Sequence, residues 1–182
     1  MAVFWAQAGN PPDGPPTVAG AGMTWTTVLT QNTNSRGLRL FRALSASPGS
    51  GALTITFTGS TPSWSAWTVV EFGNVDTSGA NGSVAVVQSA TATSDSANTL
   101  TATLAAFNDT NNATAGFFGM TGTTGVALAA GTGFSEVGEG GGAIDGMTAQ
   151  SEFLATNDTS VDSSSNETGV YVIGGVVKDG VW

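Results

Sequence analysis

The amino-acid sequence predicts an all-β fold, an antiparallel β-sandwich that is jelly-roll-like and carries an extended N-terminal arm. Short runs of β-branched and aromatic residues recur roughly every 10–15 residues, separated by Gly, Asn, Asp and Ser. No stretch has the apolar period of an amphipathic helix. The chain has 182 residues, enough for one domain, and its five Trp and nine Phe can fill a core.

The stretch 64–88 is the candidate centre of the sandwich. It holds two apolar runs, 64–72 and 84–87, joined by a turn-rich segment. Because successive side chains of a strand point to opposite faces, Trp64 and Phe72 share one face, while Trp67 and Glu71 share the other. Both faces are mostly apolar, so we expect residues 64–72 to form a central strand that is covered on both sides.

Residues 1–22 differ in composition and predict an arm. Prolines interleaved with glycine favour an extended chain without a core of its own, and an apolar tip that contains Phe4 and Trp5 precedes them. Such a tip either closes the end of its own sandwich or packs against a neighbouring subunit. The sequence therefore predicts an extended N-terminal arm at 1–22 and a β-sandwich domain at 23–182.

Further strands are expected where apolar residues alternate or cluster. The clearest is 53–58, where apolar residues alternate with threonine, the pattern of a strand with one exposed face. The step Gly174-Gly175 in the last strand suggests a bulge or a close backbone approach. The glycine-rich run 131–142 has no lysine to bind phosphate, and we interpret it as an exposed loop. The other expected strands are 23–30, 38–44, 99–104, 115–120, 126–130, 150–155 and 170–178.

Composition argues against several classes of function. The net charge is −9, with thirteen acidic and four basic residues, whereas nucleic acids and anionic membranes are bound by clustered Lys and Arg. The chain has no Cys and no His. This removes thiolate nucleophiles, imidazole bases, the usual zinc ligands and disulfides.

Targeting signals are also not apparent in the sequence. The first residues lack the basic segment and long apolar segment of a secretion signal. No run approaches the ~20 apolar residues of a membrane span. We therefore expect a chain that is made in the cytoplasm and has no membrane contact.

Glu71 is the first candidate for catalytic chemistry, because it lies in an apolar run. A carboxyl with a raised pKa could act as an acid in a sugar cleft, but glycoside hydrolysis needs a second carboxylate opposite it. The next acid, Asp76, falls in a turn. We favour a buried, paired, structural Glu71 and predict no catalytic residue and no enzyme.

Arginines cluster in one predicted strand, with Arg39 and Arg42 on opposite faces. They cannot form one anion-binding stripe, so we expect ion pairs with carboxylates, the alternative being an intersubunit contact. The candidate interface residues are Phe4, Trp5, Arg39, Arg42 and Trp182.

Two oxygen-rich loops are candidates for calcium, which prefers oxygen ligands. Neither loop has the spacing of an EF-hand, and Asn and Asp are common in turns. We expect no cofactor, with calcium as the alternative. The residues of the two loops are Asn108, Asp109, Asn111 and Asn112, and Asn157, Asp158 and Asp162.

Several segments carry a family resemblance. They are WTVVEFGNVDTSG (67–79), VVQSA (86–90), TLAAFNDTNNAT (103–114), GTGFSEVG (131–138) and NDTSVD (157–162). With the apolar run near 170–178, they make the chain similar to a β-sandwich family found among phage virion and tail structural proteins. The resemblance implies a place on the virion surface and supplies no catalytic residues.

The expected function is therefore structural. We expect a capsid decoration or stabilising protein of a bacteriophage, an oligomer on the virion surface that contacts the major capsid protein or neighbouring copies. The alternative is a carbohydrate-binding, lectin-like adhesion module in which an exposed Trp such as Trp64 stacks on sugar.

Overall fold

The structure, a computed structural model, confirms the all-β prediction. It describes residues 2–8, 14–33, 36–62, 64–107, 112–121, 127–142, 147–154 and 158–178. Within these residues no helix is long and apolar enough to cross a membrane. In chain order the described elements are β1 (Ala2–Ala8), β2 (Gly14–Gly20), β3 (Thr26–Asn32), β4 (Arg36–Arg42), β5 (Leu53–Thr58), β6 (Trp64–Val70), the 3-10 turn η1 (Ser83–Ala85), β7 (Val86–Thr103), β8 (Ala113–Thr121), β9 (Leu128–Ala130), β10 (Ser135–Gly142), β11 (Met147–Leu154) and β12 (Ser160–Lys178).

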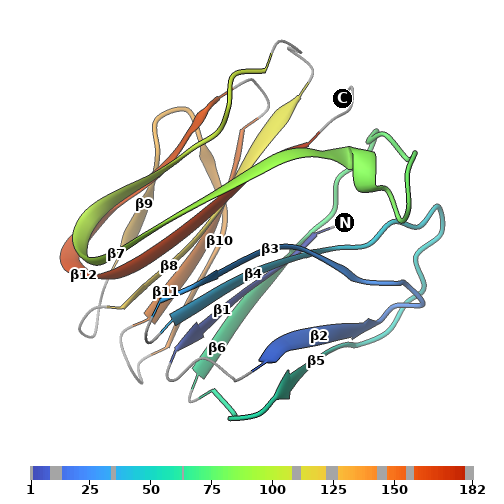
Figure 1. Ribbon diagram of the computed structural model, residues 1–182, viewed down its shortest axis with the longest axis horizontal. Coiled ribbons are helices and arrows are strands. Elements are labelled where there is room, and N and C mark those ends of the chain that lie inside the picture. Colours follow the sequence, from blue (N-terminus) through green and yellow to red (C-terminus); the bar gives the residue numbers. More distant parts are fainter. Residues whose placement is uncertain are drawn as a thin grey trace.

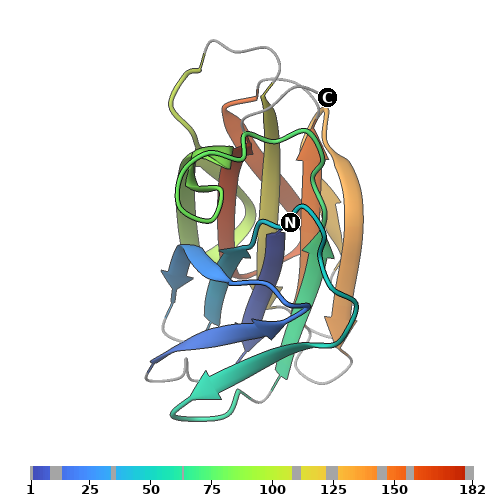
Figure 2. The same ribbon diagram turned by 90° about the vertical axis from the view of Figure 1, so that its right-hand side faces the viewer.

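The described strands form three sheets that stack as layers (Figure 1). The middle sheet has the order β3-β4-β1-β6. On one side of it lies the large sheet, with the path β10-β11-β8-β12-β7 and with β9 paired to β12. On its other side lie β2 and β5, which pair only with each other among the described strands (Figure 2). A jelly-roll topology stays a prediction.

Strand β1 lies inside the middle sheet. It pairs with β4 along one edge and with β6 along the other, so that Trp5 is opposite both Arg39 and Trp67. The expected separation of an arm at residues 1–22 from the sandwich is therefore wrong for residues 2–8. The tip AVFWAQA contains no proline, so each of its residues can take part in the hydrogen bonds of a sheet, and the prolines follow it.

Strand β8 is covered on both faces. Residues 112–120 are all buried, with Phe117 at 2% and Phe118 at 0% exposure. The prediction that residues 64–72 form the central strand is wrong, because β6 ends at Val70 and lies at the end of the strand order in the middle sheet. β8 has apolar or small residues on both faces and is buried on both, whereas Ser65 and Trp67 are exposed and leave one face of β6 open.

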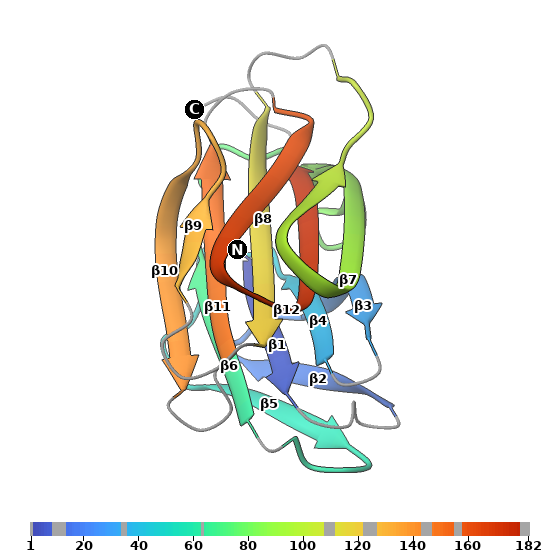
Figure 3. The same cartoon turned by 90° about the vertical axis from the view of Figure 1, so that its left-hand side faces the viewer.

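Strands β7 and β12 belong to the large sheet and form a long antiparallel ribbon, which bends so that part of it lies over the rest of that sheet (Figure 3). The register between the two strands shifts between Ser164 and Tyr171, where the ribbon bends. The side chain of Gln88 donates to the carbonyl of Ala105 (2.8 Å) and accepts from its N–H (2.9 Å), which joins the beginning of β7 to the chain after its end. We call residues 99–103 and 160–165 the returning ribbon.

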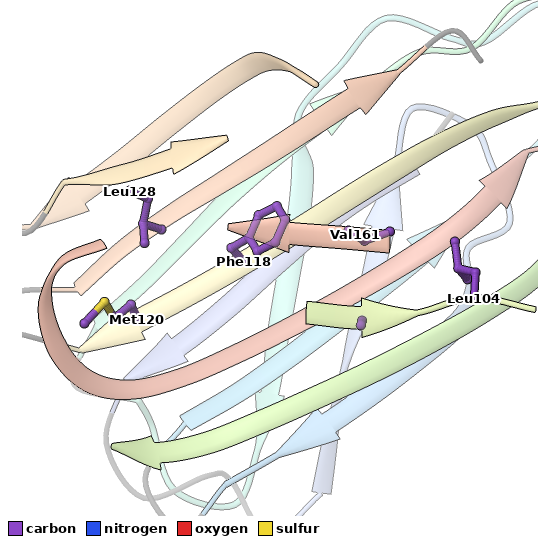
Figure 4. Close-up of a cluster of buried hydrophobic side chains, with 6 residues drawn as sticks. Leu104, Phe118, Met120, Leu128 and Val161 are labelled. Carbon is purple, nitrogen blue, oxygen red and sulfur yellow. The ribbon is translucent and has the colours of Figure 1, made fainter. Parts of the chain in front are cut away.

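The returning ribbon encloses a hydrophobic core against β8, which we call the ribbon core. The side chain of Thr114 donates to the carbonyl of Asp158 (2.8 Å), and the N–H of Leu104 donates to the carbonyl of Thr159 (2.8 Å). A methyl group added at Gly116 would lie 2.6 Å from a methyl carbon of Val161, so only glycine permits this close approach. The buried side chains, most of them labelled in Figure 4, are Ala102, Leu104, Phe118, Met120, Leu128 and Val161.

Strands β2 and β5 form what we call the outer ribbon. The prediction for residues 53–58 is confirmed in its bounds and in its alternation of half-buried and exposed residues. After β2 the chain turns through Gly20, Ala21 and Gly22, which have positive φ angles of 122°, 52° and 62°. Because a lone two-stranded ribbon is only marginally stable in water, its apolar side chains must hold it to the middle sheet.

The remaining strand predictions have mixed outcomes. All of the other expected strands overlap observed ones, although 99–104 and 170–178 are only the last parts of the much longer β7 and β12. The run 131–142 was expected to be a loop and is largely strand β10, paired with β11, so this prediction is wrong. Its glycines masked the strand signal. The register is continuous through Gly174-Gly175, so the structure has no bulge there.

Candidate functional site: an apolar groove beside Trp67

A groove of about 190 Å³ lies between the outer ribbon and the middle sheet. Strand β5 contributes one wall and β6 the other; Figure 2 shows the outer ribbon crossing in front of the middle sheet. The residues that line the groove are Leu53, Ile55, Phe57, Ser65 and Trp67.

Strand geometry explains why these side chains meet. In β5 every second residue is apolar, so Leu53, Ile55 and Phe57 share its inner face, and each is half-buried. In β6, Ser65 and Trp67 alternate with residues of the opposite face, where Thr68 lies near Gly138 of the large sheet. The two faces of β6 therefore have different roles, one in the core and one in the groove.

Trp67 is the most conspicuous side chain of the groove, with 54% of its surface exposed. Trp side chains are highly buried on average, so an exposure of more than half is unusual for this residue type. Trp is also the residue type that most often dominates the binding energy of protein interfaces. The groove can therefore bind an apolar group by desolvation and ring contact.

A second cavity, of about 50 Å³, lies deeper in the molecule and is lined largely by apolar side chains of the two facing sheets and the loop after β6. Phe41 of β4 and Ala115 of β8 are among them. Its volume is that of a few water molecules. We regard it as a packing gap between the middle and large sheets.

None of the five residues that line the groove is one of the candidate interface residues, although the backbone of Trp5 lies opposite Trp67 in the sheet. The backbone of β1 carries Phe4 and Trp5, but their side chains, and all of Trp182, lie outside the described residues. Arg39 is buried at 2% exposure and donates from one nitrogen to the Asn32 side-chain oxygen (2.7 Å) and to the carbonyls of Leu38 and Gln31. Burial lowers the pKa of the Arg39 guanidinium from its usual range.

Arg42 is half-buried and donates to two backbone carbonyls in the loop before η1, those of Asn81 (3.2 Å) and Ala80 (3.4 Å). Asn81, with a left-handed φ of 52°, also accepts from the N–H of Leu44 and donates to the carbonyl of Thr24. These hydrogen bonds tie the loop to the ends of β3 and β4. Arg42 thus has a structural contact within the chain, and its role toward a partner stays a prediction.

Glu71 is exposed and lies directly after β6. The expectation that it is buried is therefore wrong. Glu71 shares the strand face of Ser65 and Trp67, which are both exposed, so this face points away from the core.

The two oxygen-rich loops approach each other only in part. Thr114, which follows Asn112, donates to the carbonyl of Asp158, while the side chain of Asp158 accepts from the N–H of Ser160 (2.8 Å), as in an ordinary Asx turn. Burial, and then the charge of Asp158, raises the pKa of Asp162. In the part of the chain that the structure describes, no three acidic side chains gather to hold a metal. Asn108, Asp109, Asn111 and Asn157 lie outside the described residues.

Sequence reasoning named Trp64 as the exposed aromatic residue and missed Trp67. The side chain of Trp64 is outside the described residues. A signal for Trp67 was present, because Trp67 shares a strand face with Glu71 and the preceding strand presents three apolar residues on one face. Nothing in the sequence showed that these two faces would oppose each other.

Comparison with models of protein families, with curated proteins and with solved structures found no match for this chain. The family resemblance of its segments is thus a prediction on which the proposals below draw.

Proposed function

We propose that the chain is a structural protein of a phage virion, most simply a capsid decoration or stabilising protein that acts through contacts between subunits. The observation that carries the proposal is the apolar groove with its exposed Trp67. The resemblance of the segments quoted above to phage virion proteins supports it. The proposal includes a jelly-roll-like sandwich as the scaffold.

The physical basis is the addition of many weak contacts. A shell presents many copies of the same site, so modest binding at each groove sums to a large stabilisation of the assembled state. The role requires no reaction and no cofactor. The partners in this proposal are the major capsid protein or neighbouring copies of the chain, on the virion surface.

The test is to add the purified chain to phage particles from which it has been deleted. We expect saturable co-sedimentation and a rise in the temperature at which the particles release their genome. Deleting residues 1–22 is not a suitable control, because β1 is an inner strand of the middle sheet. Absence of binding to the particles at any concentration would refute the proposal.

A second candidate is a carbohydrate-binding adhesion module. The same exposed indole favours it, because aromatic side chains with one open face can stack on a sugar ring. Binding on a glycan array that disappears in Trp67→Ala, together with no binding to particles, would support this candidate over the first.

A further inference from the structure

The groove is uncharged, although the chain is strongly acidic. None of its five lining side chains carries a charge, while the chain as a whole has a net charge of −9. Among the described acidic residues, Glu71, Asp95 and Glu136 are exposed. Glu71 follows Trp67 by four positions and lies just beyond the end of β6. The groove is thus an apolar site on a negatively charged protein.

The basic side chains that the structure describes offset little of this charge at the surface. Arg39 is buried, and Arg42 is half-buried against the carbonyls of Ala80 and Asn81. A negative surface attracts a positive one and repels a second negative one. Charge complementarity therefore favours a basic partner and disfavours a second copy of this acidic chain.

The size of the groove favours a small occupant. Its volume, about 190 Å³, is below the about 300–1,000 Å³ of pockets that bind drug-sized molecules. One ring or one branched side chain fits such a volume, whereas a folded segment does not.

The chemistry of the walls favours an apolar occupant. Four of the five lining residues are apolar, and Ser65 supplies the one side-chain hydroxyl among them. A sugar ring that entered would lose hydrogen bonds between its hydroxyls and water, and among the lining side chains only the Ser65 hydroxyl and the Trp67 indole N–H could replace them. An aromatic or aliphatic side chain has at most one hydrogen bond to water to lose and would gain contact with Trp67.

We infer that the groove between β5 and β6 receives one large apolar side chain, aromatic or branched aliphatic, from a positively charged surface of a partner protein. The inference rests on the proposed function insofar as the groove is the contact surface of the chain. It adds the chemistry of the partner: a single apolar anchor surrounded by Lys or Arg. The anchor inserts beside Trp67, and the basic residues around it complement the net negative charge of the chain.

A capped peptide, Lys-Lys-Gly-Trp-Gly-Lys-Lys, is a suitable probe for titration of the ¹⁵N-labelled full chain. The indole N–H signal of Trp67, assigned with Trp67→Phe, and the amides of residues 53–57 report on the groove. We expect saturable shifts at these signals, with affinity near the millimolar range of a single anchor. Replacing the Trp of the peptide by Ser should weaken binding at least tenfold, and replacing its Lys by Ser should weaken binding and remove its salt dependence.

Variants of the chain complete the test. Trp67→Ala should abolish the shifts of residues 53–57, while Val137→Ala, which trims an apolar residue exposed elsewhere on β10, should leave them unchanged. No saturable shift with the Trp peptide, equal shifts with the Ser peptide, or stronger shifts with glucose or N-acetylglucosamine would each overturn the inference. If the particles bind the chain but the peptide does not, this inference fails and the proposed function stands. If the peptide binds the chain but the particles do not, the proposed function fails and the inference about the groove stands.

Discussion

Two ribbons cover two sheets in this molecule, and they do so differently. The returning ribbon packs on β8 so closely that Phe118 and Met120 are fully buried. The outer ribbon, β2 and β5, lies over the middle sheet and leaves a groove in which Trp67 is more than half exposed. Both ribbons present an apolar face, so hydrophobicity alone does not explain the difference.

The difference arises from what each ribbon meets. Under the returning ribbon, Gly116 removes the side chain that would keep Val161 away, and hydrogen bonds from Thr114 and Leu104 fix the approach. Under β5, the bulk of Trp67 meets Leu53, Ile55 and Phe57 with no glycine among the lining residues. The first contact builds the scaffold, while the second leaves apolar surface for another molecule.

The largest expected effect comes from the tight ribbon. Phe118→Ala should lower the free energy of unfolding by about 3–5 kcal/mol, because it removes a fully buried ring and leaves a cavity. Denaturant titration followed by circular dichroism measures this loss. A loss of less than about 1 kcal/mol in the free energy of unfolding would mean that the ribbon core is not closely packed.

Gly116→Ala tests the close approach itself. The added methyl would meet Val161 and the ring of Phe118, so we expect a loss of about 1–3 kcal/mol in unfolding free energy. Gly138→Ala is the matched control, because its methyl would meet only Thr68 at an ordinary distance of 3.8 Å. Equal effects of the two substitutions in denaturant titration would contradict the account of the returning ribbon.

Trp67→Ala should cost far less than Phe118→Ala, although Trp is the larger residue. More than half of the Trp67 surface already faces water, so we expect a change of about 1 kcal/mol or less in unfolding free energy. A loss comparable to that of Phe118→Ala would show that the groove is closed in solution and that the two ribbons are alike.

The smallest expected effect concerns Asp162 in the returning ribbon. Its pKa is raised by burial and then by Asp158, so its contribution to stability is most favourable below the unfolded-state pKa and is lost as the pH rises through the folded-state pKa. Asp162→Asn should remove this decline and change stability by less than about 0.5 kcal/mol at neutral pH.

Asp76 provides a control of opposite sign for that pH profile. Hydrogen bonds from the side chain and backbone of Ser78 lower its pKa, so its contribution is present above the unfolded-state pKa and is lost as the pH falls through the folded-state pKa. Thermal unfolding as a function of pH distinguishes Asp162→Asn from Asp76→Asn, and pH profiles that change with the same sign in both variants would contradict the assigned causes.

The sequence predicted what local alternation determines. The pattern of residues 53–58 gave β5 its bounds and its inner face, because strict alternation of apolar residues and threonine has one structural solution. The sequence did not predict that β8, and not β6, would be covered on both faces. Which of two apolar strands becomes central depends on the pairing of segments that are distant in the sequence. The burial of all residues from 112 to 120 results from such pairing and cannot be predicted from their own sequence.

Other failures have similar causes. The glycines of β10 removed the side-chain pattern on which strand prediction depends, although β11 supplies its hydrogen bonds. The sequence also did not show that Arg39 would be buried and would donate to a side-chain amide and to backbone carbonyls of its own and the neighbouring strand; its expected pairing with a carboxylate stays a prediction. The groove itself depends on how β5 lies over β6, a packing relation that neither strand encodes alone.

Binding of Trp67→Ala to virus particles that lack the chain measures directly whether the groove is the contact surface. We expect this variant, folded and nearly as stable as the original chain, to bind the particles at least tenfold more weakly, as for a dominant interface residue. Unchanged particle binding by folded Trp67→Ala would show that the groove is not the contact surface and would contradict the account.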